Sequence, residues 1–261
     1  MIPAVEFCGL QVSRLMVGGN PISGFSHQGP ERDEEMLNYY TTARIKETLQ
    51  RAEAVGITTT VLRSDPHIER IMREYCNEGG RIQWIVQLGV APSQFSGAIR
   101  RAVSLGAKAA YIHGGIGDRA YAQRDLDSLK ELIGYIHDHG IPAGVGSHSP
   151  HAHRWMYEAD LPADFHVVSF YNCGSLHDGN GEKFDAEDPP PAGEVIREID
   201  KPCIGYKIMG AGRVDAREAL QFAFANIKPG DCVNVGMYRG DNDNMVEENA
   251  AAAAEILAET N

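Results

Sequence analysis

The 261-residue chain has no apolar run close to the roughly 20 residues that a membrane-spanning helix needs. Residues 1–6 lack the basic and apolar regions of a signal peptide. The five cysteines are odd in number and widely spaced, so neither a disulfide framework nor a Cys-x-x-Cys metal site is visible. These absences predict a protein of the reducing cytoplasm.

Positive charge is also scarce, because 24 lysines and arginines face 36 aspartates and glutamates, for a net charge of -12. Such an acidic protein is poorly suited to nonspecific nucleic-acid binding or to an anionic membrane surface. A hydrophobic content of 43% with 23% charged residues is typical of a folded globular chain. We therefore expect a small-molecule substrate, and the oligomeric state stays open.

What the chain does have is a regular alternation of strand and helix patterns after an N-terminal hairpin that turns near Gly9. The expected strands are 15–20, 57–62, 84–88, 109–113, 141–146, 165–171, 201–208 and 231–236. The expected helices are 42–55, 67–75, 95–105, 126–137, 151–158, 193–199, 215–227 and 245–258. Short crossovers give parallel strands, and eight such units predict a (β/α)8 barrel that fills residues 1–261 as one domain. A doubly wound sheet is less favoured, since no G-x-G-x-x-G follows the first strand. Residues 21–40 and 178–191 are expected to be loops.

Barrel active sites lie at the carboxyl ends of the strands, and polar residues gather there in this chain. His113 directly follows an apolar strand and is the best candidate for a working imidazole. Gln87 ends an earlier strand. The substrate-binding candidates are His27, Arg63, Asp65, His148, Tyr171 and Asn172. His113 and His148 could ligate a metal, but only Asp65 offers a carboxylate at these ends, so a divalent metal is the less favoured prediction.

The stretch from Lys201 to Arg213 combines a strand pattern with a glycine-rich turn. Lys207 sits among apolar neighbours, where a buried ammonium must be paired or functional, although a snorkelling side chain at a strand end is equally open. Gly210, Gly212 and Arg213 precede a helix and could bind a phosphate or carboxylate. Arg239, before the last helix, marks a second candidate anion site, unless both turns merely connect strand to helix.

Several motifs together resemble the aldo/keto reductase superfamily over nearly the whole chain. They are the hairpin 9–15 with Gly18-Gly19, the strand ending in His113, the turn 144–148, Tyr171-Asn172 and Glu248-Asn249. The resemblance implies a (β/α)8 barrel, an NADPH cofactor and an Asp-Tyr-Lys-His catalytic set for carbonyl reduction.

The chain departs from that catalytic set at three of its positions. The family's aspartate falls near Val61, its tyrosine near Pro66 or His67, and its lysine at Gln87. Only the histidine is retained, as His113. Tyrosine is the family's proton donor, so its proton-transfer machinery is missing here.

The cofactor region is partly retained. The resemblance implies that Tyr206 stacks on the nicotinamide and that Arg239 with Asn249 lies near the adenosine phosphate. NADPH therefore stays possible as a cofactor.

Three functions remain open. In the first, a divergent enzyme acts on a small polar carbonyl or sugar-like substrate, by lyase- or isomerase-type chemistry. Lys207 is then a base or Schiff-base nucleophile and His113 an acid/base, while Gln87 and Asn172 orient oxygen atoms. In the second, an NADPH-dependent oxidoreductase uses His67 or His113 as proton donor. The third is a ligand-binding relative without catalysis.

Overall fold

The structure, a computed structural model, describes residues 2–172 and 184–259, and its centre is a closed barrel of eight parallel strands in the order β10-β3-β4-β5-β6-β7-β8-β9. The strands are β3 (Leu15–Gly18), β4 (Thr59–Arg63), β5 (Gln83–Leu88), β6 (Ala109–Ile112), β7 (Ala143–Ser147), β8 (Phe165–Ser169), β9 (Cys203–Tyr206) and β10 (Cys232–Gly236). This confirms the predicted (β/α)8 fold.

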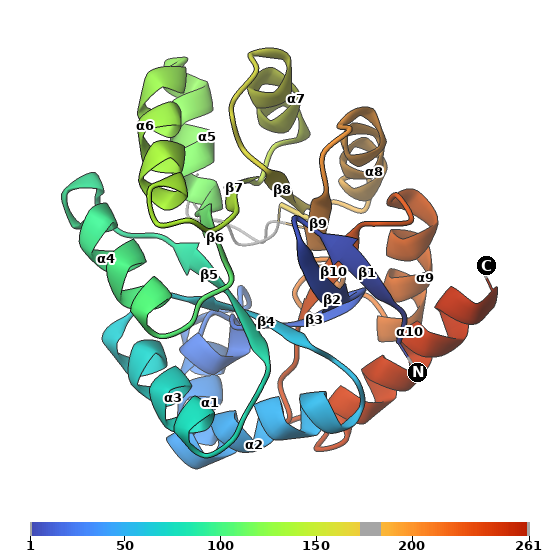
Figure 1. The fold of residues 1–261 in the computed structure, drawn as a ribbon. Coiled ribbons are helices and arrows are strands. Elements are labelled where there is room, and N and C mark those ends of the chain that lie inside the picture. Colours follow the sequence, from blue (N-terminus) through green and yellow to red (C-terminus); the bar gives the residue numbers. More distant parts are fainter. Residues whose placement is uncertain (1, 173–183, 260–261) are drawn as a thin grey trace.

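Helices surround the barrel as an outer ring (Figure 1). They are η1 (Pro21–Ser23), α1 (Pro30–Tyr39), α2 (Thr42–Ala54), α3 (Pro66–Asn77), α4 (Pro92–Ser104), α5 (Gly114–Gln123), α6 (Leu126–His137), α7 (Pro150–Glu158), α8 (Pro189–Glu198), α9 (Ala216–Asn226) and α10 (Met245–Glu259). Among the described residues, no helix is both long and apolar enough to cross a bilayer.

The predicted hairpin closes the amino-terminal end of the barrel, which faces the viewer in Figure 1. Its strands are β1 (Ala4–Phe7) and β2 (Leu10–Ser13), paired antiparallel. The two residues between them, Cys8 and Gly9, both have positive φ, as a two-residue turn between twisted strands requires. Phe7 is fully buried against Phe165 of β8, with ring centroids 5.2 Å apart, so this end is plugged by side chains.

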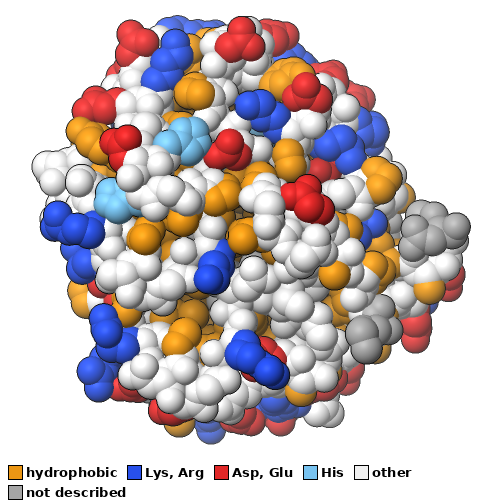
Figure 2. Space-filling model, viewed as in Figure 1, with side chains coloured by type: hydrophobic (Ala, Val, Ile, Leu, Met, Phe, Trp, Pro, Cys, Tyr) orange, Lys and Arg blue, Asp and Glu red, His pale blue; other side chains and the backbone are white. Residues whose placement is uncertain are grey.

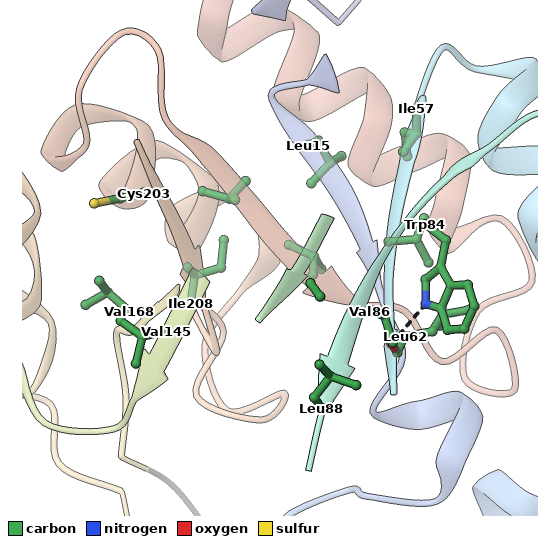
Figure 3. Packing of buried hydrophobic residues seen from close by; sticks show 14 of the residues in the cluster. Leu15, Ile57, Leu62, Trp84, Val86, Leu88, Val145, Val168, Cys203 and Ile208 are labelled. Carbon is green, nitrogen blue, oxygen red and sulfur yellow. Dashed lines mark hydrogen bonds between the residues drawn. The ribbon is translucent and has the colours of Figure 1, made fainter. Parts of the chain in front are cut away.

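Side chains on each strand alternate between the barrel axis and the helices. Trp84, Val86 and Leu88 of β5 point outward into the layer shown in Figure 3, where the Trp84 indole donates to the Leu62 carbonyl at 3.0 Å. Ile85 of the same strand packs inside the barrel. This alternation directs Gln87 toward the axis, at the carboxyl end.

Several predictions about the bounds of the elements are wrong. The loop expected over 21–40 contains η1 and α1, because Pro30 starts a helix that buries only Met36 and so shows no apolar stripe. Helix α5 was not predicted, because the glycines at its start are poor helix formers. The strand expected to reach residue 208 ends at Tyr206, and Lys207 follows it with φ 55°.

Part of the loop predicted over 178–191 lies outside the described residues, which resume at residue 184. Helix α8 begins at Pro189 and not at the expected residue 193. Proline suits the first turn of a helix because the amide it lacks would have no partner there.

Candidate active site

His113 lies at the carboxyl end of β6 and caps the amino terminus of α5. Its Nδ1 accepts a hydrogen bond from the amide of Gly115 at 3.0 Å. Nδ1 is therefore the acceptor, and the neutral ring carries its proton on Nε2. Burial, followed by the charges of His148 and Lys207, lowers the pKa of His113 to about 4. At neutral pH the ring is an uncharged Nε2–H donor.

His148 follows β7, and its Nδ1 has the opposite role, that of a donor. Its Nδ1 lies 2.7 Å from Oδ2 of Asp118, a residue of α5. Asp118 also accepts from the His148 amide at 2.9 Å and from the hydroxyl of Ser147. Burial opposes ionisation of Asp118, but the hydrogen bonds of His148 and Ser147 outweigh it and lower the pKa of Asp118 to about 2. An ionised carboxylate only accepts, so Nδ1 of His148 carries a proton and donates it to Asp118.

The two imidazoles and the Tyr206 ring surround Gly114. The His148 centroid lies 6.2 Å from that of His113 and 5.8 Å from that of Tyr206. A Cβ at Gly114 would stand 2.9 Å from Cε1 of His148 and 3.2 Å from the Tyr206 hydroxyl. Only glycine permits this approach, so the start of α5 is shaped around the rings.

Gln87 lies at the end of β5, paired in register with Tyr111 of β6. Its Nε2 donates to the Tyr111 hydroxyl at 2.7 Å. Burial raises the pKa of the Tyr111 phenol, which makes it a fixed partner for Gln87 and a poor acid. Asn234 of β10 is paired in register with Tyr206, and its buried Oδ1 has no hydrogen-bond partner among the described residues. Sequence reasoning missed Asn234.

Two cations face His113, because the charges of Lys207 and Arg63 both depress its pKa. Nζ of Lys207 lies 5.9 Å from the Tyr206 ring centroid. Arg63 is held by Asp65, whose Oδ2 lies 3.2 Å from Nε, and its guanidinium covers the Phe25 ring at 5.0 Å. Asp118 acts on His113 in the opposite sense, and the charge of Arg63 is partly balanced by Asp65.

Some substrate-binding candidates have a structural role in this geometry. Asp65 caps α3 by accepting from the amide of Ile68 at 2.9 Å, and His67 lies exposed in the first turn of that helix. His27 has positive φ, and its Nε2 lies 3.2 Å from Nδ2 of Asn20.

The candidates that follow β8 pack beside the start of α8. The Tyr171 ring stacks on that of Phe184 at 5.0 Å, and the amide of Asn172 donates to Asp188 at 2.9 Å. Both contacts fix the described ends of the loop between β8 and α8.

The predicted anion sites differ in accessibility. Gly210 and Gly212 both have positive φ, and Arg213 donates to the carbonyls of Gly210 and His27. Arg213 therefore ties the glycine turn to the loop after β3.

Arg239, by contrast, is buried. It forms ion pairs with Glu47 at 2.8 Å and Asp243 at 2.6 Å, and donates to Thr48. Asn249 is buried in α10. The guanidinium that the resemblance assigns to the adenosine phosphate is thus held by two carboxylates, and this region does not fit NADPH in the family's manner. Within the described part of the chain, no three His, Cys, Asp or Glu side chains are placed to share a metal ion.

Comparison with known proteins identifies the fold but no function. No protein-family model and no curated protein matches the chain. A Pseudomonas aeruginosa protein named as an aldo-keto reductase is 17% identical, with 98% of this chain and 94% of that chain covered and a TM-score of 0.63. An aldo-keto reductase from Bacillus halodurans is 12% identical, with 99% and 96% covered and a TM-score of 0.63.

The chain has the aldo-keto reductase fold. This confirms the resemblance that the sequence motifs indicated, at the level of the fold. A truncated 3-deoxy-D-arabino-heptulosonate 7-phosphate synthase from Thermotoga maritima matches as well, at 9% identity, 99% and 93% coverage and a TM-score of 0.57. Because barrels of this shape host unrelated reactions, chemistry has to be argued from the residues of the mouth.

Proposed function

We propose that this protein is a lyase- or isomerase-type enzyme that moves protons on a small, polar, sugar-like carbonyl substrate at the barrel mouth. The observation that carries the proposal is the pair of imidazoles with opposite tautomers, a fixed donor at His113 and a fixed acceptor at His148. Removing a proton from the carbon beside a carbonyl needs both, a base for the proton and a donor for the oxygen.

His148 is the general base in this proposal. Its Nε2 takes the proton from carbon, and the imidazolium that forms is stabilised by Asp118 through Nδ1. Asp118 stays ionised at neutral pH because its pKa lies near 2. The carboxylate therefore both fixes the tautomer and balances the new charge.

His113 is the electrophile. Its pKa of about 4 keeps the ring neutral, so Nε2–H can donate to a carbonyl oxygen that becomes negative as the proton leaves. Lys207 and Arg63 add positive potential beside that oxygen. Gln87 and the buried Oδ1 of Asn234 supply partners for substrate hydroxyls, since a buried acceptor without a partner is costly until a ligand satisfies it.

Deuterium exchange tests the proposal. We expect the wild-type protein in D2O to place deuterium at the carbon beside the carbonyl of at least one of dihydroxyacetone, xylulose and fructose, followed by NMR. His148→Gln should slow this exchange by roughly 10³-fold, the size expected of general-base loss. His139→Gln is the matched control, because His139 only hydrogen-bonds the Tyr135 carbonyl outside the mouth. Full exchange in His148→Gln would contradict the proposal, and micromolar NADPH binding with carbonyl reduction would replace it with the oxidoreductase alternative.

A further inference from the structure

A second pair of histidines lies buried behind the mouth, in the wall between β8 and α7. Nδ1 of His153 and Nδ1 of His166 lie 3.0 Å apart, and both side chains are shielded from solvent. Burial lowers the pKa of His153 to about 4, and burial together with the charge of His153 lowers that of His166. Both rings are therefore neutral at physiological pH.

The contact of His153 with the Ser147 carbonyl is the basis on which a proton is assigned to each ring, and the Val167 carbonyl also acts on the His153 ring. Nε2 of His153 lies 3.3 Å from the carbonyl of Ser147, and a carbonyl can only accept. The His153 proton is thus on Nε2, which leaves Nδ1 as an acceptor. His166 must then donate from its own Nδ1, so the chain of donors runs from His166 through His153 to Ser147.

Ser147 joins this chain to the mouth. Its carbonyl accepts from His153, while its hydroxyl donates to Oδ1 of Asp118 and accepts the Ser149 amide at 3.0 Å. Asp118 in turn holds Nδ1 of His148. Each of these contacts is described in the structure. The side chains that follow His148 in the chain are all at least partly buried, and they are Asp118, Ser147, His153 and His166.

The geometry points to His153 and His166 as positioning residues that hold Ser147, and through it Asp118, in the orientation that fixes the His148 tautomer. The inference rests on the proposed function only for its catalytic consequence, since the tautomer of His148 can be measured without any substrate. His153 lies on α7 and His166 on β8, so the chain also locks a helix of the outer ring to the barrel wall.

Charged groups on both sides of the His153–His166 pair affect its protonation. Asp118 and His148 act on His153 from the mouth, while Lys201 and Lys228 act on His166 from the opposite end. A proton added to Nδ1 of His153 would point at Nδ1 of His166, which carries a hydrogen already. His166 would then have to exchange its tautomer, and the donor chain would break.

Four single substitutions separate a positioning role from simple packing. Gln places its amide near the Nε2 position of histidine and Asn near the Nδ1 position. His153→Gln therefore keeps the donor to Ser147, and His153→Asn loses it. The pattern reverses at His166, where His166→Asn keeps the donor and His166→Gln loses it.

The tautomer of His148 is measured by NMR of its ring nitrogens in 15N-labelled full-length protein. Thermal unfolding of each variant shows whether it is folded. We expect His153→Gln and His166→Asn to keep the Nδ1–H form of His148, and His153→Asn and His166→Gln to lose it. On the deuterium-exchange substrate, the two disruptive variants should lower kcat roughly tenfold at unchanged KM, the scale of a small misplacement.

Ser147→Ala is a further variant in case the histidine variants fail to fold. It removes the hydrogen bond from the Ser147 hydroxyl to Asp118 and leaves both buried rings in place. We expect it to reproduce the His148 signature of the disruptive variants. An unchanged His148 tautomer in Ser147→Ala and in folded His153→Asn would overturn the inference. If the wild type exchanges no deuterium but the NMR pattern appears, the positioning stands and the proposed function falls.

Discussion

The two ends of the barrel each carry a histidine–aspartate pair, and the two pairs lie in different surroundings. At the carboxyl end, Nδ1 of His148 lies 2.7 Å from Asp118, with side chains 7% and 20% exposed. At the amino end, Nε2 of His137 lies 2.8 Å from Asp164, with side chains 39% and 42% exposed. The distances are nearly equal, so separation alone does not distinguish a catalytic pair.

What differs is the surroundings. Water screens the exposed pair, and the amino-terminal face around it mixes charges of both signs (Figure 2). Cys8 donates to the Asp164 carbonyl there, and burial together with the charges of Asp164 and Glu6 raises the pKa of its thiol to about 12. The carboxyl-end pair is largely buried. It lies beside the His113 ring, and Lys207 and Arg63 lie near that ring.

The largest difference should appear when the carboxylate of each pair is removed in turn. Asp118→Asn keeps the shape but lets Nδ1 of His148 lose its proton, so deuterium exchange should fall roughly 10³-fold. Asp164→Asn should change the same rate less than about twofold, as expected of a screened surface pair. Equal losses of exchange rate in the two variants would contradict a special role for the carboxyl-end pair.

The next largest effect is a fall in the free energy of unfolding at low pH. An unfolded histidine titrates near 6.5, whereas His153 titrates at about 4 in the fold, so the unfolded chain binds a proton that the folded chain does not. The stability is present above pH 6.5 and is lost as pH falls toward 4, by up to about 3 kcal/mol for this residue. Urea unfolding from pH 7.5 to 4.5 measures the slope.

The double variant His153→Gln, His166→Asn removes this titration and keeps the donor to Ser147, so its slope should be shallower than that of the wild type. His137→Gln, which changes only the exposed ring, should leave the slope as it is. A double variant with the wild-type slope would mean that other groups govern acid unfolding.

Lys207→Ala should lower the exchange rate by about 10²-fold, through loss of the positive charge that faces His113. Lys201→Ala, at the opposite end and bound to the Ala163 carbonyl, is the control and should keep the rate. If Lys207 acts instead as a Schiff-base nucleophile, borohydride with the substrate will trap an adduct on it. Full activity of Lys207→Ala would remove this residue from the mechanism.

The smallest effect compares two helical glycines. Gly114→Ala puts a methyl group against His148 and Tyr206, and we expect kcat to fall about tenfold with little change in fold. Gly134→Ala meets no atom within 4 Å and should stabilise the protein by roughly 0.5–1 kcal/mol. Kinetics and thermal unfolding of both variants check this, and wild-type kinetics in Gly114→Ala would show that the rings are not packed as described.

The sequence was enough to predict the barrel, the hairpin and the end of the barrel where His113, His148 and Gln87 lie, because strand periodicity and strand ends are local patterns. It did not reveal Asp118. Helix α5 begins with Gly114-Gly115-Ile116-Gly117, a composition typical of a turn, and only the fold shows that these glycines make room for rings.

Other residues show that a pattern gives a residue's place in the chain but not its partners. Arg239 is cationic and precedes a helix, as an anion site requires, yet its guanidinium is taken by Glu47 and Asp243. Nothing in the sequence pattern distinguishes His153, and it is buried against His166.

The most direct test of the account is the protonation of the mouth imidazoles in the wild-type protein, followed by 15N NMR between pH 5 and 8. The account predicts that His113 stays neutral with its proton on Nε2 throughout, while His148 carries its proton on Nδ1 at neutral pH. A His113 ring that gains charge near pH 6.5, or the same tautomer in both rings, would contradict it.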